Sequence, residues 1–133
     1  QSTEDMVGAN IAVEAESAGQ KAVEADENLS QAEMVAVGAQ SDTLMEVAAG
    51  TSDVAVIDAV MAYASVGEGT SYSDLVVVDG IELGKEEYGI GFRKGSNLVE
   101  AVNTALQELT DEGVLDELQQ KYPSVLVTLE KSA

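Results

Sequence analysis

Two short stretches of the chain carry residues that could bind a small charged ligand. In AVEAESAGQKA, residues 12–22, a strand-like run leads through Ser17, Ala18 and Gly19 into a helical segment. The first turn of a helix presents unpaired N–H groups and a partial positive charge, which suit a carboxylate or a phosphate. Ser17 would add a hydroxyl, and Gly19 would let a ligand approach the backbone. The alternative is that Ser17 serves only as the N-cap of the helix.

The second stretch is DVAVID, residues 53–58, which ends in a carboxylate. A side chain at the carboxyl end of a buried parallel strand lies where α/β proteins bind their ligands. Burying the charge of Asp58 is costly unless the carboxylate meets a cation, and an ammonium group is one such cation. The alternative is that Asp58 caps a helix that begins near Ala59. The residues alone leave both interpretations open.

Several kinds of site are excluded by composition and spacing. The chain has no cysteine and no histidine, so it has no disulfides, thiolate nucleophiles, Ser-His catalysis or imidazole metal ligands. Ser17 does not lie in a G-x-S-x-G nucleophile motif, and GIGFRKG, residues 89–95, has the wrong spacing for a dinucleotide-binding loop. The acidic pairs at residues 86–87 and 111–112 fit no calcium-loop pattern and indicate solvated surface. We therefore expect no metal, no cofactor and no catalytic residues.

The net charge of the chain limits the classes of partner that it can bind. Its 133 residues include 25 acidic and 6 basic side chains, a formal net charge of −19. Such a surface repels phosphate backbones and anionic lipids, so we expect no nucleic-acid partner. A secreted or surface protein fits this charge, and so does a halophilic source. No stretch is apolar enough to span a membrane, and QSTEDMVG is no signal peptide, so an export signal would have to lie upstream.

Apolar periodicity predicts an alternation of strands and helices. A helical turn near the N-terminus precedes the first strand, and Ser41 and Ser96 are the expected N-caps of two later helices. The expected strands are residues 11–15, 34–37, 53–60, 75–79 and 88–95, and the expected helices are residues 20–28, 42–49, 59–64, 97–112 and 114–122. The last ten residues suggest either an edge strand or disorder. This order is typical of an α/β fold with a mostly parallel sheet flanked by helices.

Taken in order, three segments resemble one family. IAVEAESAGQ is similar to the general pattern VAVQAGSTGE of family 3 extracellular solute-binding proteins, the amino-acid-binding components of bacterial ABC importers. A second segment, LMEVAAGTSDVAVIDAVMA, resembles their pattern aL..G..Da...D. The third, EEYGIGFRKGSNLVEAVNTALQELTDEGVLDELQQKY, resembles their closing segment. The resemblance covers residues 3–122 and implies the C-terminal half of a periplasmic-binding-protein type II fold.

What the resemblance implies is a protein of two lobes that close around an amino acid. Residues 1–88 would be lobe 2, residues 89–95 a hinge strand, and residues 96–133 the C-terminal helices and tail of lobe 1, whose remainder is missing. Residues 17–19 would hold the α-carboxylate and Asp58 the α-ammonium group. This chain departs from the family at Ala18, where a threonine is common, and at Glu16, where a glycine is common. In the family, the arginine that binds the ligand α-carboxylate belongs to lobe 1.

The same resemblance implies partners and a location. The chain would work with an ABC permease, and the parent protein would be extracellular or periplasmic, either secreted or anchored as a lipoprotein. Ligand-sensing domains of receptors and sensor kinases share this fold, as do the cyclohexadienyl dehydratases, which are enzymes. The closing helices carry an apolar stripe that the missing part of lobe 1 would cover, formed by Leu98, Val102, Ala105, Leu106, Leu109, Leu115, Leu118 and Tyr122. We therefore expect a homodimer through residues 88–122, either by packing of the two copies or by exchange of their C-terminal segments.

Overall fold

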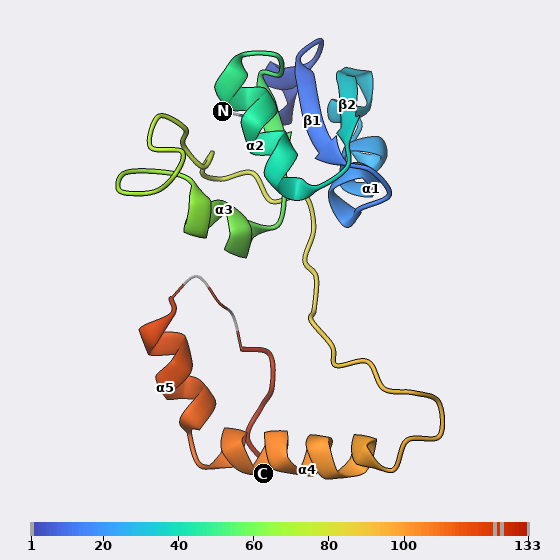
Figure 1. Cartoon of the computed structure of the whole chain (residues 1–133), viewed down its shortest axis with the longest axis vertical. Coiled ribbons are helices and arrows are strands. Elements are labelled where there is room, and N and C mark those ends of the chain that lie inside the picture. The colour runs from blue at the N-terminus through green and yellow to red at the C-terminus, as the bar shows by residue number, and fades with distance from the viewer. Residues whose placement is uncertain (1, 124, 126, 133) are drawn as a thin grey trace. The chain divides into compact units, whose positions relative to one another are not determined.

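The computed structural model describes residues 2–123, 125 and 127–132 (Figure 1). The chain divides between Lys85 and Glu86 into two compact units, and each is described by itself. Within the described residues, no helix has both the length and the apolar character needed to cross a membrane.

A three-stranded parallel sheet forms the centre of the first unit. Its strands are β1 (Asn10–Glu14), β2 (Glu33–Val37) and β3 (Val54–Val56), in the order β2-β1-β3. Val13 of β1 lies opposite Ala36 of β2 and Val56 of β3. The chain crosses from β1 to β2 through α1 (Ala18–Ala25) and from β2 to β3 through α2 (Gln40–Ala49). The predicted α/β architecture, a parallel sheet flanked by helices, is confirmed.

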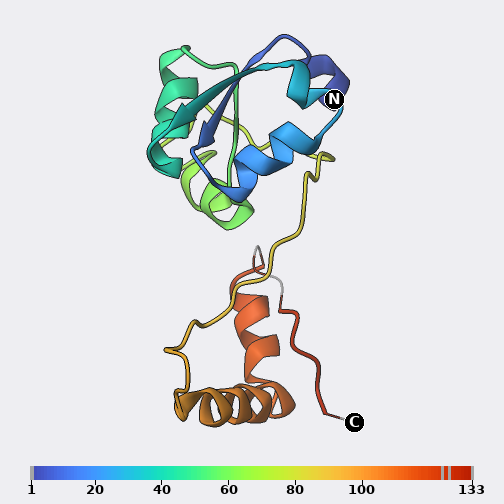
Figure 2. The same ribbon diagram turned by 90° about the vertical axis from the view of Figure 1, so that its right-hand side faces the viewer.

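The core lies around β1, the central strand. Ile11, Ala12 and Val13 have no solvent-exposed surface. Successive side chains of a strand point to opposite faces of the sheet, so Ile11 and Val13 share one face, where they pack with Val23 of α1 and with Leu29. Figure 2 shows α1 and α2 on opposite sides of the sheet, as right-handed crossovers in this strand order require. Both faces of β1 are therefore covered.

Short helical elements complete the first unit. Two 3-10 helices span Thr3–Met6 and Leu29–Gln31, and α3 spans Ala59–Ser65. The helix expected at residues 20–28 begins two residues earlier and ends at Ala25. Gly50 ends α2 as predicted, with a φ of 74° in the left-handed region that favours glycine. The prediction that Ser41 caps this helix is wrong, because α2 begins at Gln40 and Ala39 occupies the cap position.

Two strand predictions in the first unit need correction. The strand expected at residues 53–60 is only Val54–Val56, because Asp58 caps α3 and turns the end of the apolar run into a helix. The strand expected at residues 75–79 does not form, and the side chain of Val76 is 80% exposed. A run of β-branched residues favours extended backbone, but a strand also needs a neighbouring strand to accept its hydrogen bonds. None of the described strands pairs with this segment.

The second unit consists of two helices and extended chain. The helices are α4 (Leu98–Asp111) and α5 (Val114–Lys121), separated at Gly113 as predicted. The prediction that Ser96 is the N-cap of α4 is wrong by one residue, because Asn97 occupies the cap position. The Oγ of Ser96 still accepts from the N–H of Leu98 at 3.2 Å. The strand expected at residues 88–95 is absent from the described structure, which has neither helix nor strand there.

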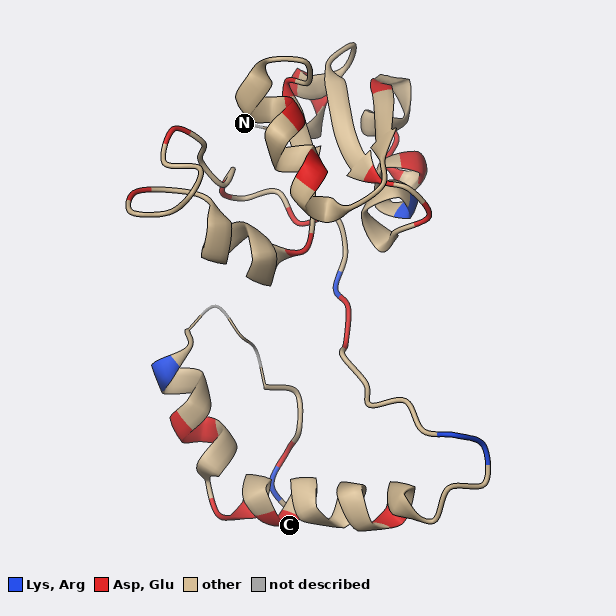
Figure 3. Ribbon diagram, viewed as in Figure 1, with Lys and Arg blue, Asp and Glu red and all other residues tan. Residues whose placement is uncertain are grey.

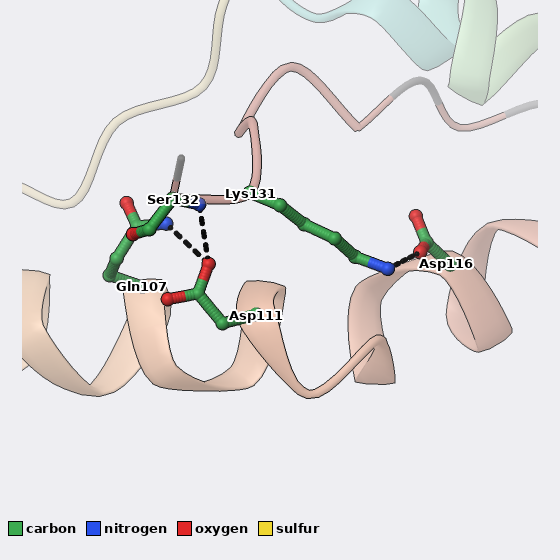
Figure 4. Close-up of polar contacts among 5 residues, drawn as sticks. All are labelled: Gln107, Asp111, Asp116, Lys131 and Ser132. Atoms are coloured by element: carbon green, nitrogen blue, oxygen red, sulfur yellow. Dashed lines mark hydrogen bonds and ion pairs between the residues drawn. The ribbon is translucent and has the colours of Figure 1, made fainter.

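Polar contacts attach the C-terminal tail to the two helices (Figure 4). The carboxylate of Asp111 accepts from the N–H of Ser132 at 2.7 Å, and the side-chain amide of Gln107 donates to the carbonyl oxygen of Glu130 at 3.0 Å. Lys131 forms an ion pair of 2.8 Å with Asp116 of α5. The described tail residues, 125 and 127–132, form no strand, and Ser124, Leu126 and Ala133 lie outside the described residues.

Candidate functional site

The carboxyl edge of the sheet brings the sequence-predicted residues into one region. The chain passes from the central strand β1 to β2 on one side of it, and then from β2 back across to β3 on the other side. The direction of the connections therefore reverses between β1 and β3. Such a switch point is where open α/β sheets bind ligands. Residues 17–19 follow β1 and Asp58 follows β3, and these strands are adjacent and parallel. The two stretches therefore lie at the same edge of the sheet.

Residues 17–19 form the beginning of α1. Ser17 is the N-cap, with extended backbone, and its Oγ accepts a hydrogen bond from the N–H of Gln20 at 3.1 Å. The capping interpretation of Ser17 is therefore confirmed. Ala18 and Gly19 are the first two residues inside the helix, where helix geometry provides no carbonyl partner for an N–H group. The exposed position of Ala18 leaves this turn accessible from solvent.

Gly19 lies against β3 more closely than another residue could. A Cβ atom built on Gly19 would be 2.9 Å from the carbonyl oxygen of Val56. Real Cβ atoms do not approach a backbone oxygen so closely, because the contact is shorter than the sum of the van der Waals radii. The glycine thus lets the start of α1 pack directly on the last residue of β3.

The residue before the cap is backbone-strained. Glu16 has a φ of 63°, and among the described residues it alone combines a positive φ with a side chain other than glycine's. Its N–H donates to Oε1 of Gln20 at 2.8 Å, and Nε2 of Gln20 donates to Glu24 at 2.7 Å. The Gln20 side chain therefore binds the backbone of the turn. A glycine would adopt this left-handed backbone without steric strain.

Asp58 is the N-cap of α3. Its Oδ1 accepts from the N–H of Met61 at 3.0 Å, and the side chain is half-buried. Its own N–H donates to Oε1 of Gln40, the first residue of α2, at 3.1 Å. The capping interpretation of Asp58 is confirmed, and nothing in these contacts tests a role in ligand binding. The bond from Met61 fixes the carboxylate of Asp58 at the start of α3, and the bond to Gln40 fixes its backbone.

Gln40 contacts Asp58 at the candidate site, and the sequence did not point to it. It opens α2 directly after β2, so it lies at the same carboxyl edge as Ser17 and Asp58. Its side chain joins the beginning of α2 to the beginning of α3. The signal that could have identified it is its place, three residues after the predicted second strand. Side chains at that place in a parallel α/β unit regularly face the ligand edge.

The surroundings of this edge are acidic and open. Figure 3 shows Asp and Glu distributed over the first unit, where the only basic residues are Lys21 and Lys85. Two hollows of about 280 and 300 Å³ lie elsewhere in this unit, and neither is lined by Ser17, Gly19 or Asp58. No group of three or more His, Cys, Asp or Glu residues that could hold a metal ion occurs in the described part of the chain.

Searches against models of known protein families, curated proteins and solved structures found no match to this chain.

Proposed function

We propose that this chain is the second lobe of an amino-acid-binding protein, together with the helices that close the chain, and that it presents the α-amino-acid subsite at the carboxyl edge of its sheet. The observation that carries the proposal is the placement of residues 17–19 and Asp58 after adjacent parallel strands, at the switch point between β1 and β3. The family resemblance of residues 3–122 supports the same assignment. In a parent importer, this lobe would serve an ABC permease outside the cell membrane.

The start of α1 has the chemistry to bind a carboxylate. The N–H groups of Ala18 and Gly19 point out of the first turn, and the helix dipole adds a partial positive charge there. The Ser17 hydroxyl accepts from Gln20, and a hydroxyl that accepts one bond can still donate its own hydrogen to a ligand oxygen. Backbone groups supply most of this site, so Ala18 in place of threonine removes only one side-chain bond.

Asp58 has the chemistry to bind an ammonium group. Asp58 caps α3 by accepting from Met61, and a carboxylate has two oxygens that can each accept more than one donor, an ammonium group among them. The half-buried setting strengthens a charge-assisted hydrogen bond relative to one at the open surface. The acidic first unit also attracts a cationic group over a longer range. A carboxylate site and an ammonium site at one edge together match the two ends of an amino acid.

A lone lobe should bind weakly. Two-lobed binders obtain much of their affinity from closure around the ligand, and at the proposed site Ala18 is exposed. We therefore expect this chain to bind free amino acids no more tightly than the millimolar range, in which a complex is worth about 4 kcal/mol. Submicromolar affinity of the 133-residue chain would contradict the assignment to one lobe.

A titration of the chain, followed by NMR, tests the subsite. A panel of amino acids should shift the amide signals of Ala18, Gly19 and Met61, whereas acetate and methylammonium, each with only one of the two charges, should shift them less. Asp58→Asn should weaken binding at least tenfold, because charge-assisted hydrogen bonds contribute about 1.5–3 kcal/mol. Asparagine is also a good N-cap, so α3 should remain folded.

Asp74→Asn is the matched control for this titration. Asp74 is exposed in the same unit, so the variant removes the same charge away from the proposed site. It should bind as the wild type does. Equal affinities of wild type and Asp58→Asn would show that Asp58 is only a helix cap, and amide shifts confined to other residues would place the site elsewhere. Calorimetry on a protein that carries both lobes should show the same tenfold loss.

A further inference from the structure

Strand β2 forms an outer edge of the sheet, and this edge has unpaired backbone groups. The N–H of Glu33 and the carbonyl oxygen of Val37 are bonded to the chain on either side of β1. Backbone groups alternate in direction along a strand, so those of Met34 and Ala36 point away from β1. Among the residues that the structure describes, none provides a hydrogen-bond partner for these groups. The edge can therefore accept a further strand.

A hollow of about 280 Å³ opens beside the same strand. It is lined by Val23 and Glu24 of α1, by Leu29, Ser30 and Ala32, and by Met34 of β2. Met34 lies opposite Ile11 and packs with the core on the α1 face of the sheet. A strand added beside β2 would place every second side chain on that face, next to the hollow. Most of the lining residues are apolar, so an aliphatic side chain suits this place.

Carboxylates flank the edge on both faces of the sheet. Glu24 lines the hollow, whereas Glu33, at the start of β2, lies with Val35 on the opposite face. Both carboxylates belong to exposed residues. Lys21 is the only basic residue of α1, and it does not line the hollow. A segment added to the edge therefore meets negative charge on each side of its backbone, which favours lysine or arginine in that segment.

We propose that the open edge of β2 binds an extended peptide in which aliphatic and basic residues alternate. Backbone hydrogen bonds to Met34 and Ala36 hold the peptide, an aliphatic side chain occupies the hollow, and basic side chains lie near Glu33. In this mode of recognition the backbone bonds supply affinity and the alternate side chains supply specificity. Neither Ser17 nor Asp58 lines the hollow, so the proposal does not depend on the amino-acid subsite.

A second copy of this chain is a poorer occupant of the edge than a basic peptide. Pairing of two β2 edges would bring the carboxylates of Glu24 and Glu33 from both copies together, in a dimer of two chains that each carry a net charge of −19. Charged side chains on a short edge strand are a common protection against such self-pairing. The same carboxylates attract a cationic segment, and this difference favours the peptide.

A titration with synthetic peptides, followed by NMR, tests the proposal. The first probe has about six residues, alternating valine and lysine, with blocked ends. It should shift the amide signals of Met34 and Ala36 and slow their hydrogen exchange, because both N–H groups gain a partner. A peptide with glutamate in place of lysine should bind at least about tenfold more weakly, and added NaCl should reduce this preference. A peptide with serine in place of valine should also bind more weakly, because it leaves the hollow unfilled.

Ala36→Pro tests the backbone contact. Proline removes the N–H of residue 36, which faces away from β1, so the hydrogen bonds between β1 and β2 should remain. The variant should bind the lysine peptide at least about tenfold more weakly than the wild type, since an edge donor is lost. Ala36→Val keeps that N–H and should bind as the wild type does. Unchanged amide signals of Ile11 and Val13 would show that Ala36→Pro retains its sheet.

A pair of charge variants tests the edge without changing the backbone. Glu24→Gln combined with Glu33→Gln should remove most of the preference for the lysine peptide over the glutamate peptide. Glu68→Gln combined with Asp74→Asn removes the same charge from exposed residues that do not line the hollow, and it should keep the preference.

Four outcomes would overturn the proposal. Absence of binding at millimolar peptide, or amide shifts confined to residues outside 23–36, would show that the edge takes no such partner. Equal affinities for the lysine and glutamate peptides would remove the role of the carboxylates. Undiminished binding by a folded Ala36→Pro would exclude strand addition. A dimer in sedimentation equilibrium, with the Met34 and Ala36 amides protected before any peptide is added, would show that a second copy occupies the edge.

Discussion

Gly19 and Val56 are in contact across the site edge: a Cβ atom on Gly19 would lie 2.9 Å from the carbonyl oxygen of Val56. The contact joins the first turn of α1 to the last residue of β3, two residues before Asp58. It therefore sets the spacing between the proposed carboxylate subsite and the proposed ammonium subsite. An atom added at position 19 must move either the helix or the strand.

Gly19→Ala should lower the free energy of unfolding by about 1–3 kcal/mol, the usual cost of overpacking a close contact. Urea denaturation followed by circular dichroism measures it. Gly38→Ala is the matched control, because an added Cβ there meets only a carboxylate oxygen of Asp42 at 4.0 Å. It should lose no stability. Equal stabilities of the two variants would mean that the packing of α1 on β3 is looser than described.

Replacing the strained Glu16 separates backbone strain from charge. A side chain in the left-handed region costs about 1–2 kcal/mol, and the greater freedom of an unfolded glycine offsets part of that cost. Glu16→Gly should therefore be about 1 kcal/mol more stable than Glu16→Ala in urea denaturation, although both remove the same charge. If the two variants were equally stable, the φ of 63° would not be a source of strain.

Attachment of the tail should depend on pH, at the acid extreme for its contact with α4 and at the alkaline extreme for its contact with α5. The hydrogen bond from the Ser132 N–H, followed by the one from Gln107, lowers the pKa of Asp111 below its ordinary 3.8, so this contact is present above pH 3.8 and is lost as pH falls through the lowered pKa. The hydrogen bond and ion pair with Asp116 raise the pKa of Lys131 above 10.5, so that contact is present below pH 10.5 and is lost as pH rises through the raised pKa.

The Ser132 amide signal in NMR reports the acid transition of this attachment. It should shift below pH 3.8 in the wild type, and Asp111→Asn should remove the transition. Both side chains are exposed, so the unfolding midpoint of the whole chain should change little between pH 5 and 9 on their account. An acid shift of Ser132 that persists in Asp111→Asn would assign the transition to another carboxylate.

The fold should be stabilised by salt. Sixteen of the 25 acidic residues lie in the first unit, where only Lys21 and Lys85 oppose them. Their mutual repulsion is screened as ionic strength rises, so thermal unfolding measured by circular dichroism should move to higher temperature between 0.05 and 1 M NaCl. A variant in which the exposed Glu68, Asp74 and Asp79 become amides should show a smaller rise. A midpoint independent of salt would contradict this account.

The sequence by itself determined several local features of this protein. The buried run at Ile11–Val13, the glycine stop at Gly50 and the apolar stripe of α4 each follow from side-chain size and spacing along a few residues of chain. Short-range effects of this kind act within a single helix or strand, so they can be recognised without knowing what the segment contacts. The capping interpretations of Ser17 and Asp58 could be stated from sequence for the same reason.

Only the tertiary structure decided which of these segments meet. The order β2-β1-β3 makes β1 and β3 neighbours, so the turn after β1 lies beside the end of the strand that precedes Asp58, and neither residue type nor spacing specifies strand order. The role of Gln40 as acceptor for the Asp58 N–H joins residues 18 positions apart and has no local signature. Residues 75–79 show the converse, because their strand-like composition formed no strand. Strand pairing depends on hydrogen bonds to a segment that is distant in the sequence, and the side chains of one segment do not reveal whether such a pairing strand lies beside it.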